Sequence, residues 1–361
     1  MEEYDFIYLW FKLGNLRNSV VLSLEERLAD IGQILHISEK EAVERGFMSA
    51  ENANHLYNQK NNVNAFIEKM YLSGIQFIHH HSPGYPPKLH NIPDKPYGLF
   101  IKGNIPSENP GVAIVGARDA TEYGLQMSYK LSKELSGCGI DVISGMARVI
   151  DNSAHKGALA FGGKKYEVLG CGVDVCYPRE NIETYTKILE SGGGIISEYL
   201  PDSKPLAWQF PMRNRIISGL SDVVILAEAK EKSGSLITVD QALEQGREVF
   251  VLPGRVTDNL SKGCNNLIKS GANILTDVSD VVEYFQNIHH INVKKNVKNK
   301  IMLASEEKIV YSVLDLLPKS LSEIVTQLDM DTACVMNILL RLELLGIVKE
   351  TMKNYYVKVI E

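Results

Sequence analysis

The chain has 361 residues, of which 45% are hydrophobic and 23% charged, a composition typical of folded proteins and unlike disordered, collagen-like or membrane-embedded chains. At about 150 residues per domain, this length predicts two or three domains. The formal net charge of −6 excludes a broadly basic surface, so a nucleic-acid site would need a local convergence of cations and backbone amides.

The first part of the chain predicts helices. Apolar residues recur at helical spacing through residues 1–75 without a clear strand, so we expect a helical domain of the SAM or helix-hairpin-helix type there. The chain begins acidic and Lys12 breaks its first apolar stretch, which argues against a signal peptide. Since no run of about 18 apolar residues occurs either, we expect a cytoplasmic location. Residues 76–110 hold too many prolines for a helix and predict an extended Pro-rich connector.

Neither the histidines nor the cysteines predict a metal site. The run His79–His81 looks like a metal cluster, but successive side chains of an extended segment alternate faces and cannot all reach one ion. The five cysteines are scattered without a CxxC pair, which argues against a tetrathiolate zinc site or a disulfide framework.

Residues 111–286 predict a doubly wound α/β domain, which is Rossmann-like. Short apolar β-rich runs alternate there with longer amphipathic segments, and the runs are almost continuous in Val, Ile and Leu. Such strands belong to a parallel sheet that helices cover on both faces. The six apolar runs lie at 111–116, 141–145, 166–170, 194–197, 222–228 and 248–254.

The C-terminal part predicts a basic linker and a winged helix. Residues 287–303 hold four lysines and no acidic residue, a pattern typical of a linker. Residues 304–361 show three helical segments followed by an alternating stretch that suits a hairpin. The third segment, 331–345, offers a polyanion only Arg341 and Asn337, against the acidic Asp331 and Glu343. Its core residues are Val335, Ile338, Leu339, Leu342 and Leu345. We therefore expect protein contacts or regulation, not duplex reading, from this domain.

The ends of the predicted parallel strands carry groups that suit phosphate. The first strand lacks the GxGxxG spacing, and the second ends in Ser144-Gly145 without the acidic residue that binds a ribose, which excludes a dinucleotide dehydrogenase. What remains is glycines, hydroxyls and arginines near helix starts, where backbone N–H groups and the helix dipole attract anions. These residues are Gly116, Ala117, Arg118, Ser144, Gly145, Arg148, Gly170, Gly172, Phe210, Arg213, Asn214, Arg215, Ser233, Gly234 and Ser235.

Plainer interpretations of the same residues remain open at this point. Gly116 would serve a tight turn and Arg118 a surface ion pair without any ligand. Asp151 and His155 stand four residues apart, on one helix face, and suit acid–base work or metal binding. We favour a structural role for that pair, because the sequence supplies no third ligand and such a pair can anchor a helix.

The motifs are similar to those of the DNA-processing protein A (DprA) family. The stretches that carry the resemblance are, in chain order, IVGARDATEYG, SGMARVIDNSAHKGAL, VLGCGVDVCYPREN, SEYLP, FPMRNRIISGLSDVVILAEA, KSGSLITVDQALEQGREVFVLPG and SKGCNNLIKSGA. They cover about residues 85–285, and the resemblance is weaker over the two terminal regions.

The resemblance implies a non-catalytic protein of natural transformation and recombination that needs no cofactor or metal. Such a protein binds single-stranded DNA without marked sequence preference, protects incoming DNA, and helps load the RecA recombinase where single-strand-binding protein covers the strand. It forms a homodimer, with the contact expected at about residues 260–285. Phosphate-binding positions carried over are Gly116, Ala117, Arg118, Ser144, Gly145, Arg213, Asn214, Arg215, Lys262 and Asn265, with Phe210 as the base-stacking residue.

Two departures and one alternative accompany the resemblance. Ala117 stands where serine or threonine is usual, and Val149 replaces a glycine. The alternative is a nucleotide-processing phosphoribohydrolase of the same superfamily, which needs a glutamate where this chain has Gln241. Because glutamine cannot act as a general base, we prefer the DNA-binding interpretation; a small-ligand sensor is a further alternative.

Overall fold

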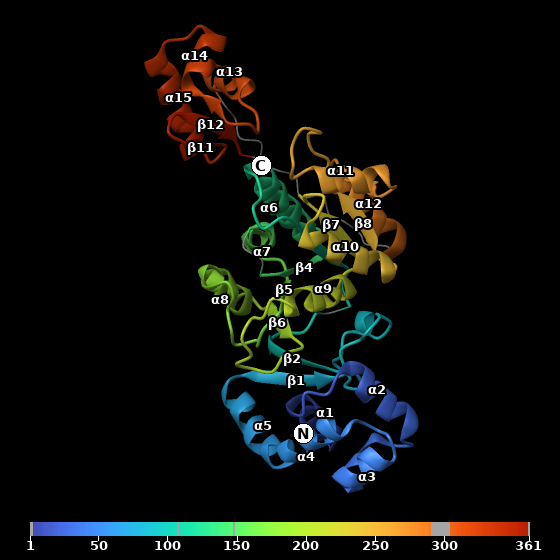
Figure 1. Cartoon of the computed structure of the whole chain (residues 1–361). Helices are drawn as coiled ribbons and strands as arrows, with labels where there is room; N and C mark the ends of the chain where they lie inside the picture. Colours follow the sequence, from blue (N-terminus) through green and yellow to red (C-terminus); the bar gives the residue numbers. More distant parts are fainter. Residues whose placement is uncertain (1–2, 107, 147–148, 290–303, 360–361) are drawn as a thin grey trace.

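The computed structural model describes residues 3–106, 108–146, 149–289 and 304–359, and shows an α/β protein built around one nine-stranded sheet. Helices of the N-terminal region lie at one end of the sheet, and the C-terminal region lies at the other (Figure 1). The predicted fold class is confirmed. Among the described residues, no helix combines the length and apolar character needed to cross a bilayer.

The central sheet is mostly parallel. Its order is β1-β2-β6-β5-β4-β3-β7-β8-β9, with parallel pairs from β6 to β9 and antiparallel pairs at β1–β2 and β2–β6. The six predicted strands are β3 to β8. The strands are β1 (Ile75–His79), β2 (Gly98–Gly103), β3 (Gly111–Val115), β4 (Asp141–Gly145), β5 (Lys165–Leu169), β6 (Gly194–Ser197), β7 (Val223–Leu226), β8 (Glu248–Val251) and β9 (Asn273–Ile274).

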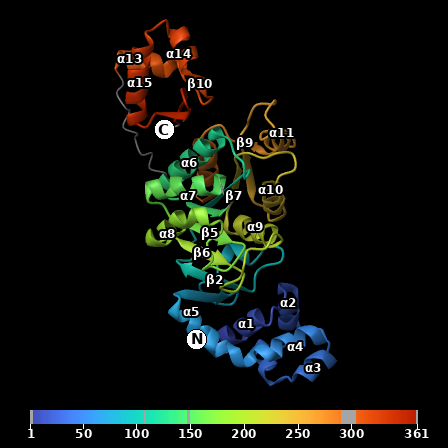
Figure 2. The ribbon, with the colours of Figure 1, turned by 60° about the vertical axis from the view of Figure 1, so that its left-hand side comes forward.

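Helices cover both faces of the sheet because alternate strand residues point to opposite sides. On β3, Val112 packs in one apolar cluster with Leu135 and Ala154, and Val115 packs in another with Ile216. Figure 2 shows the two helical layers on either side of the strands. The helices of this region are α6 (Glu122–Gly137), α7 (Ile150–Phe161), α8 (Ile182–Glu190), α9 (Gln209–Leu220), α10 (Gly234–Glu244), α11 (Lys262–Lys269) and α12 (Val278–His289), with 3-10 turns η3 (Pro87–Leu89) and η4 (Arg179–Asn181).

The segment 76–110 differs from the extended connector that the prolines predict. It supplies β2 and nearly all of β1, which pair with each other and extend the sheet beyond β6. The prolines fall between β1 and β2 or between β2 and β3, outside the strands, so they do not interrupt the pairing. A strand at a sheet edge or near a turn tolerates such neighbours.

The N-terminal helices form their own apolar cluster, which continues into the sheet. Trp10 and Leu56 are fully buried in it, together with Phe100 of β2 and Ile188 of α8. Serine side chains cap two of the helices, Ser38 for α3 and Ser49 for α4. The elements are α1 (Glu3–Leu13), α2 (Asn18–Arg27), η1 (Ile31–His36), α3 (Glu39–Glu44), α4 (Ala50–Gln59), η2 (Lys60–Asn62) and α5 (Val63–Leu72).

The C-terminal region has the elements of a winged helix: three helices and a small antiparallel sheet of order β10-β12-β11. Leu345, which we expected in its core, is 47% exposed because the third helix ends one residue earlier. Most of the predicted basic linker, and Arg148, lie outside the described residues. The elements are α13 (Ser305–Val313), β10 (Lys319–Ser320), α14 (Leu321–Leu328), α15 (Thr332–Leu344), β11 (Val348–Met352) and β12 (Tyr355–Lys358).

One carboxylate, that of Glu198 after β6, joins the N-terminal helices to the sheet domain. It accepts two hydrogen bonds of 2.9 Å from Arg215 of α9 and one of 2.9 Å from Asn18 of α2. Lys12 of α1 lies 4.0 Å away, and Arg215 also donates to the backbone carbonyl of Asp94. Burial would raise the pKa of Glu198, but Arg215 and Lys12 outweigh burial and hold that pKa below its ordinary value.

Replacing Glu198 by glutamine should therefore lower the free energy of unfolding by about 3 kcal/mol, because Lys12 loses its ion-pair partner and Arg215 keeps only that with Asp94. Since the pKa of Glu198 is lower in the folded state than in the unfolded one, its contribution is full above the unfolded pKa and declines on acidification. The loss caused by Glu198→Gln should thus shrink as the pH falls in urea-unfolding measurements.

The matched control is Glu183→Gln, which breaks an exposed pair with Lys187 one helical turn away and should cost no more than about 0.5 kcal/mol. Equal small effects of the two substitutions would contradict the role assigned to Glu198.

Candidate nucleic-acid interface

A cleft of about 700 Å³ lies at the carboxyl ends of β3, β4, β5 and β7. Parallel strands end at the same edge of a sheet, and folds of this class bind ligands there. The polar and aromatic residues that line the cleft are Arg118, Asp119, Asp151, Tyr177, Phe210, Arg213, Asn214, Lys230, Lys232, Ser233, Ser235 and Thr238. Four cations against two carboxylates give this edge a local positive charge in an acidic chain.

The loop after β3 forms one wall and is held by Glu228 at the end of β7. A Cβ atom on Gly116 would lie 2.9 Å from Ile150 and 3.2 Å from the carbonyl oxygen of Glu228, so this close approach requires glycine. The Ala117 N–H donates to that carbonyl at 2.8 Å. The Glu228 carboxylate accepts from the backbone N–H and hydroxyl of Thr121, the N-cap of α6. The predicted loop residues therefore line the cleft in a rigid turn.

Arg118 and two aromatic rings stand together in the cleft. The guanidinium carbon of Arg118 lies 6.0 Å from the ring centroid of Phe210. The Tyr177 ring lies 5.7 Å from that of Phe210, with 34° between their planes. Because Arg118 and Tyr177 are exposed, this group offers a phosphate contact beside an aromatic surface.

Arg213 lines the cleft from below, and its guanidinium is held by the fold. Its side chain is 6% exposed and donates to the carbonyl oxygen of Val168 in β5. A Cβ atom on Gly145 would lie 2.5 Å from a guanidinium nitrogen of Arg213. Gly145, which we expected in an anion-binding turn, is thus required to make room for this arginine.

Several predicted residues are not brought into the cleft. Arg215 pairs with Glu198 on the other side of α9, so we withdraw it from the candidate phosphate contacts. The buried Ser144 hydroxyl donates to the carbonyl of Ile114. Lys262 is exposed at the start of α11 but does not line the cleft. The Asn265 amide exchanges hydrogen bonds with the backbone of Gly254 instead.

The sequence analysis missed two lysines on the opposite wall. Lys230 and Lys232 are exposed there, immediately before Ser233 caps α10. The N-terminus of α10 therefore faces the cleft with its own partial positive charge. Both lysines lie between the end of β7 and the helix cap Ser233, a position that could have identified them as phosphate-binding candidates. The sequence analysis named only the following residues, Ser233–Ser235.

His155 lies beneath the cleft rather than in it. It is fully buried on α7, 3.9 Å from Glu167 of β5, and burial lowers its pKa to about 3. A neutral, inaccessible imidazole suits packing better than proton transfer, which agrees with the structural role favoured for Asp151 and His155.

The outward face of α15 carries apolar side chains. Met336, Leu340 and Leu344 are 47%, 56% and 81% exposed and stand four residues apart, on one side of the helix. Arg341 is exposed as well. A helix that reads duplex DNA would present cations and amides along such a face.

The fold and cleft define a class, an α/β protein with a cation-lined cleft at the carboxyl edge of its sheet. The family model described as DNA recombination-mediator protein A matches residues 76–286, and the chain belongs to that family. The DNA processing protein DprA of Streptococcus pneumoniae is 43% identical over 203 residues, 56% of this chain and 71% of that protein. DprA of Bacillus subtilis is 42% identical over 212 residues, 58% of this chain and 71% of that protein.

Comparison with solved structures also finds members of the DNA-processing protein A family. The crystal structure of DprA from Streptococcus pneumoniae superposes with a TM-score of 0.68 at 35% identity, and covers 77% of this chain and 97% of its own. DNA processing protein A of Helicobacter pylori, whose structure is described for its single-stranded DNA binding mode, superposes with a TM-score of 0.53 at 29% identity over 59% of this chain and 96% of its own.

Proposed function

We propose that this protein binds single-stranded DNA in the cleft at the carboxyl edge of its sheet. The observation that carries the proposal is the meeting of Arg118, Lys230, Lys232 and the N-terminus of α10 around two aromatic rings. The cations and amides would hold phosphates, which attracts nucleic acid of any sequence. The single-stranded DNA binding described for the Helicobacter pylori relative supports the assignment.

The aromatic pair favours a single strand over a duplex. Bases stack on Phe210 and Tyr177 only if they are free of their neighbours, and such stacking tolerates any base. In a duplex the bases already stack on one another, so their faces are not accessible to the rings of Phe210 and Tyr177. We assign Arg213 to the bottom of the cleft, where its positive charge would attract a bound phosphate without direct exposure to solvent.

As a recombination mediator, the protein would protect incoming DNA and help load RecA on strands that single-strand-binding protein covers. Membership of the DNA recombination-mediator family supports this finer proposal. The apolar face of α15 suits a protein partner better than a polyanion, so we assign the winged helix to protein contacts.

We propose further that the protein is not an enzyme. The Gln241 side chain of α10 donates to the carbonyl oxygen of Pro211 at 3.2 Å, which ties α10 to α9 and leaves no general base at the position where the phosphoribohydrolases carry one. Incubation with nucleoside monophosphates should release no free base above the blank by chromatography. Turnover that depends on Gln241 would contradict the proposal.

Replacing Arg118 by alanine should weaken binding to a labelled oligothymidine and reduce the slope of log affinity against log salt by about 0.7, because one phosphate contact is lost. Fluorescence anisotropy at several salt concentrations measures both. Arg341→Ala on α15 removes the same charge from an exposed site outside the cleft and should change neither. An intact slope in Arg118→Ala would exclude this phosphate contact.

Arg118→Ala also tests the mediator proposal. Wild-type protein should speed RecA assembly on oligonucleotide covered by single-strand-binding protein, and Arg118→Ala should do so less. If wild-type protein binds single strands but never speeds assembly, the RecA proposal fails while the DNA-binding proposal stands.

We propose a homodimer, with its contact within residues 260–285. One cleft holds few nucleotides, and two clefts on one strand raise the effective concentration of the second. The segment contains β9, the edge strand of the sheet, whose Ile274 is 47% exposed; such an edge offers unpaired backbone groups. In sedimentation equilibrium at micromolar concentration, Ile274→Asp should shift the protein toward monomer.

The control is Ile309→Asp on α13, an equally exposed isoleucine outside the segment, which should leave the dimer intact. A monomeric wild-type chain, or a dimer unaffected by Ile274→Asp, would contradict the proposed contact.

A further inference from the structure

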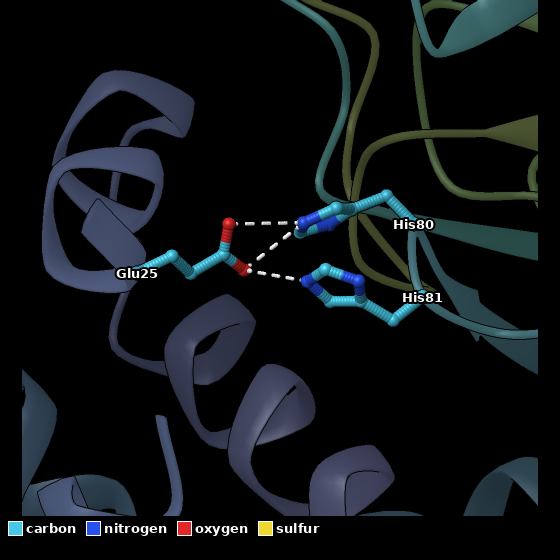
Figure 3. A group of neighbouring side chains, drawn as sticks. All are labelled: Glu25, His80 and His81. Atoms are coloured by element: carbon cyan, nitrogen blue, oxygen red, sulfur yellow. Dashed lines mark hydrogen bonds and ion pairs between the residues drawn. The ribbon is translucent and has the colours of Figure 1, made fainter. Parts of the chain in front are cut away.

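Three side chains of types that bind metal ions lie together between the N-terminal helices and the sheet. None of them lines the cleft. Glu25 comes from α2, and His80 and His81 come from the turn that follows β1. Figure 3 shows both imidazole rings directed at the Glu25 carboxylate. One donor atom from each of the three side chains lies within 4.8 Å of the other two.

The sequence analysis rejected a cluster in which His79, His80 and His81 all hold one ion, because it took the run as extended, with neighbouring rings on opposite faces. The structure also keeps His79 out of the group, but it brings His80 and His81 together. Strand β1 ends at His79, and the chain turns at His80. His79 stacks on Tyr8 instead, while the rings of His80 and His81 come to 4.1 Å between centroids, on one side.

The contacts of His80 leave its Nε2 facing a carboxylate. Its Nδ1 lies 3.2 Å from the carbonyl oxygen of Tyr97, which can only accept, so Nδ1 carries a proton. Its Nε2 lies 3.0 Å from the Glu25 carboxylate, which also only accepts, and His80 is 97% buried. Either a proton or a metal ion at Nε2 satisfies this contact.

A metal ion placed at this contact would bind both histidines as well as Glu25. Nε2 of His81 lies 3.5 Å from the same Glu25 oxygen. A tetrahedral ion with bonds of about 2.0–2.1 Å holds its donors about 3.3 Å apart. The observed separations of 3.0 and 3.5 Å match that spacing.

The surroundings orient the ligands as they do in known metal sites. The Tyr8 hydroxyl donates to one Glu25 oxygen, and the Tyr97 carbonyl fixes the tautomer of His80. Outer hydrogen bonds of this kind hold ligand rings and carboxylates in place for the ion. The His81 side chain is 58% exposed, which gives water access to the remaining coordination position.

We propose that Glu25, His80 and His81 bind one divalent transition-metal ion, of which Zn²⁺ is the best match. Two imidazoles and one carboxylate suit Zn²⁺ and exclude Mg²⁺ and Ca²⁺, which take oxygen ligands. Because the ligands come from α2 and from the end of β1, the ion links the N-terminal helices to the edge strand of the sheet.

The test uses the full-length, tag-free chain after treatment with a chelator. Titration with Zn²⁺ in a calorimeter should give one ion per chain. Glu25→Gln and His81→Ala should each weaken binding at least about tenfold. The matched control, His36→Ala, removes an exposed histidine outside the group and should bind as the wild type does. Zn²⁺ should also raise the melting temperature of the wild type and of His36→Ala more than that of the other two.

Co²⁺ distinguishes this site from adventitious binding to the five cysteines, since a nitrogen and oxygen site gives no thiolate-to-cobalt absorption. The proposal is overturned if the wild type fails to bind one Zn²⁺ per chain, if Glu25→Gln and His81→Ala both bind as the wild type does, or if thiolate absorption accompanies binding. The Glu25 side chain is 18% exposed and that of His81 58% exposed, and circular dichroism checks that both variants remain folded.

Discussion

Parallel pairing of β5, β4, β3 and β7 brings four strand ends to one edge of the sheet, and the candidate site depends on this constraint. Loops that are far apart in the chain meet there because their strands are hydrogen-bonded neighbours. Arg118 follows β3 and Lys230 follows β7, yet both face one cleft. A chain with a net charge of −6 thereby gathers positive charge at the cleft that we propose as the DNA-binding site.

Two arginines on α9 have different roles: Arg213 lines the cleft, and Arg215 forms a structural ion pair with Glu198. Arg213 and Arg215 are two positions apart, which is about 200° around a helix. One guanidinium therefore reaches the floor of the cleft, and the other reaches Glu198 at the N-terminal side. Both are buried, and each is compensated by neighbouring carbonyl or carboxylate oxygens. Burial of an unpaired charge would be too costly for either to be retained.

The N-terminal helices are joined to the sheet by two kinds of contact, to which the proposed metal ion would add a third. Their apolar cluster includes Phe100 of β2, so packing alone already couples the two regions. Glu198 adds a buried ionic connection through Arg215. The group of Glu25 and His80 lies at the end of β1, where the proposed ion would add a third link. The region predicted as a connector is thus the surface on which the N-terminal helices are fixed.

The sequence by itself determined the doubly wound class, the six parallel strands and the position of the loop at Gly116, because apolar strand runs and the residue types that follow them are local features of the chain. The tertiary structure alone decided which cations share a cleft. It brought in Lys230 and turned Arg215 away, since the direction of a side chain depends on what packs around its helix. It also decided that His80 and His81 face one carboxylate, because the end of a strand depends on its pairing with a partner 20 or so residues later in the chain.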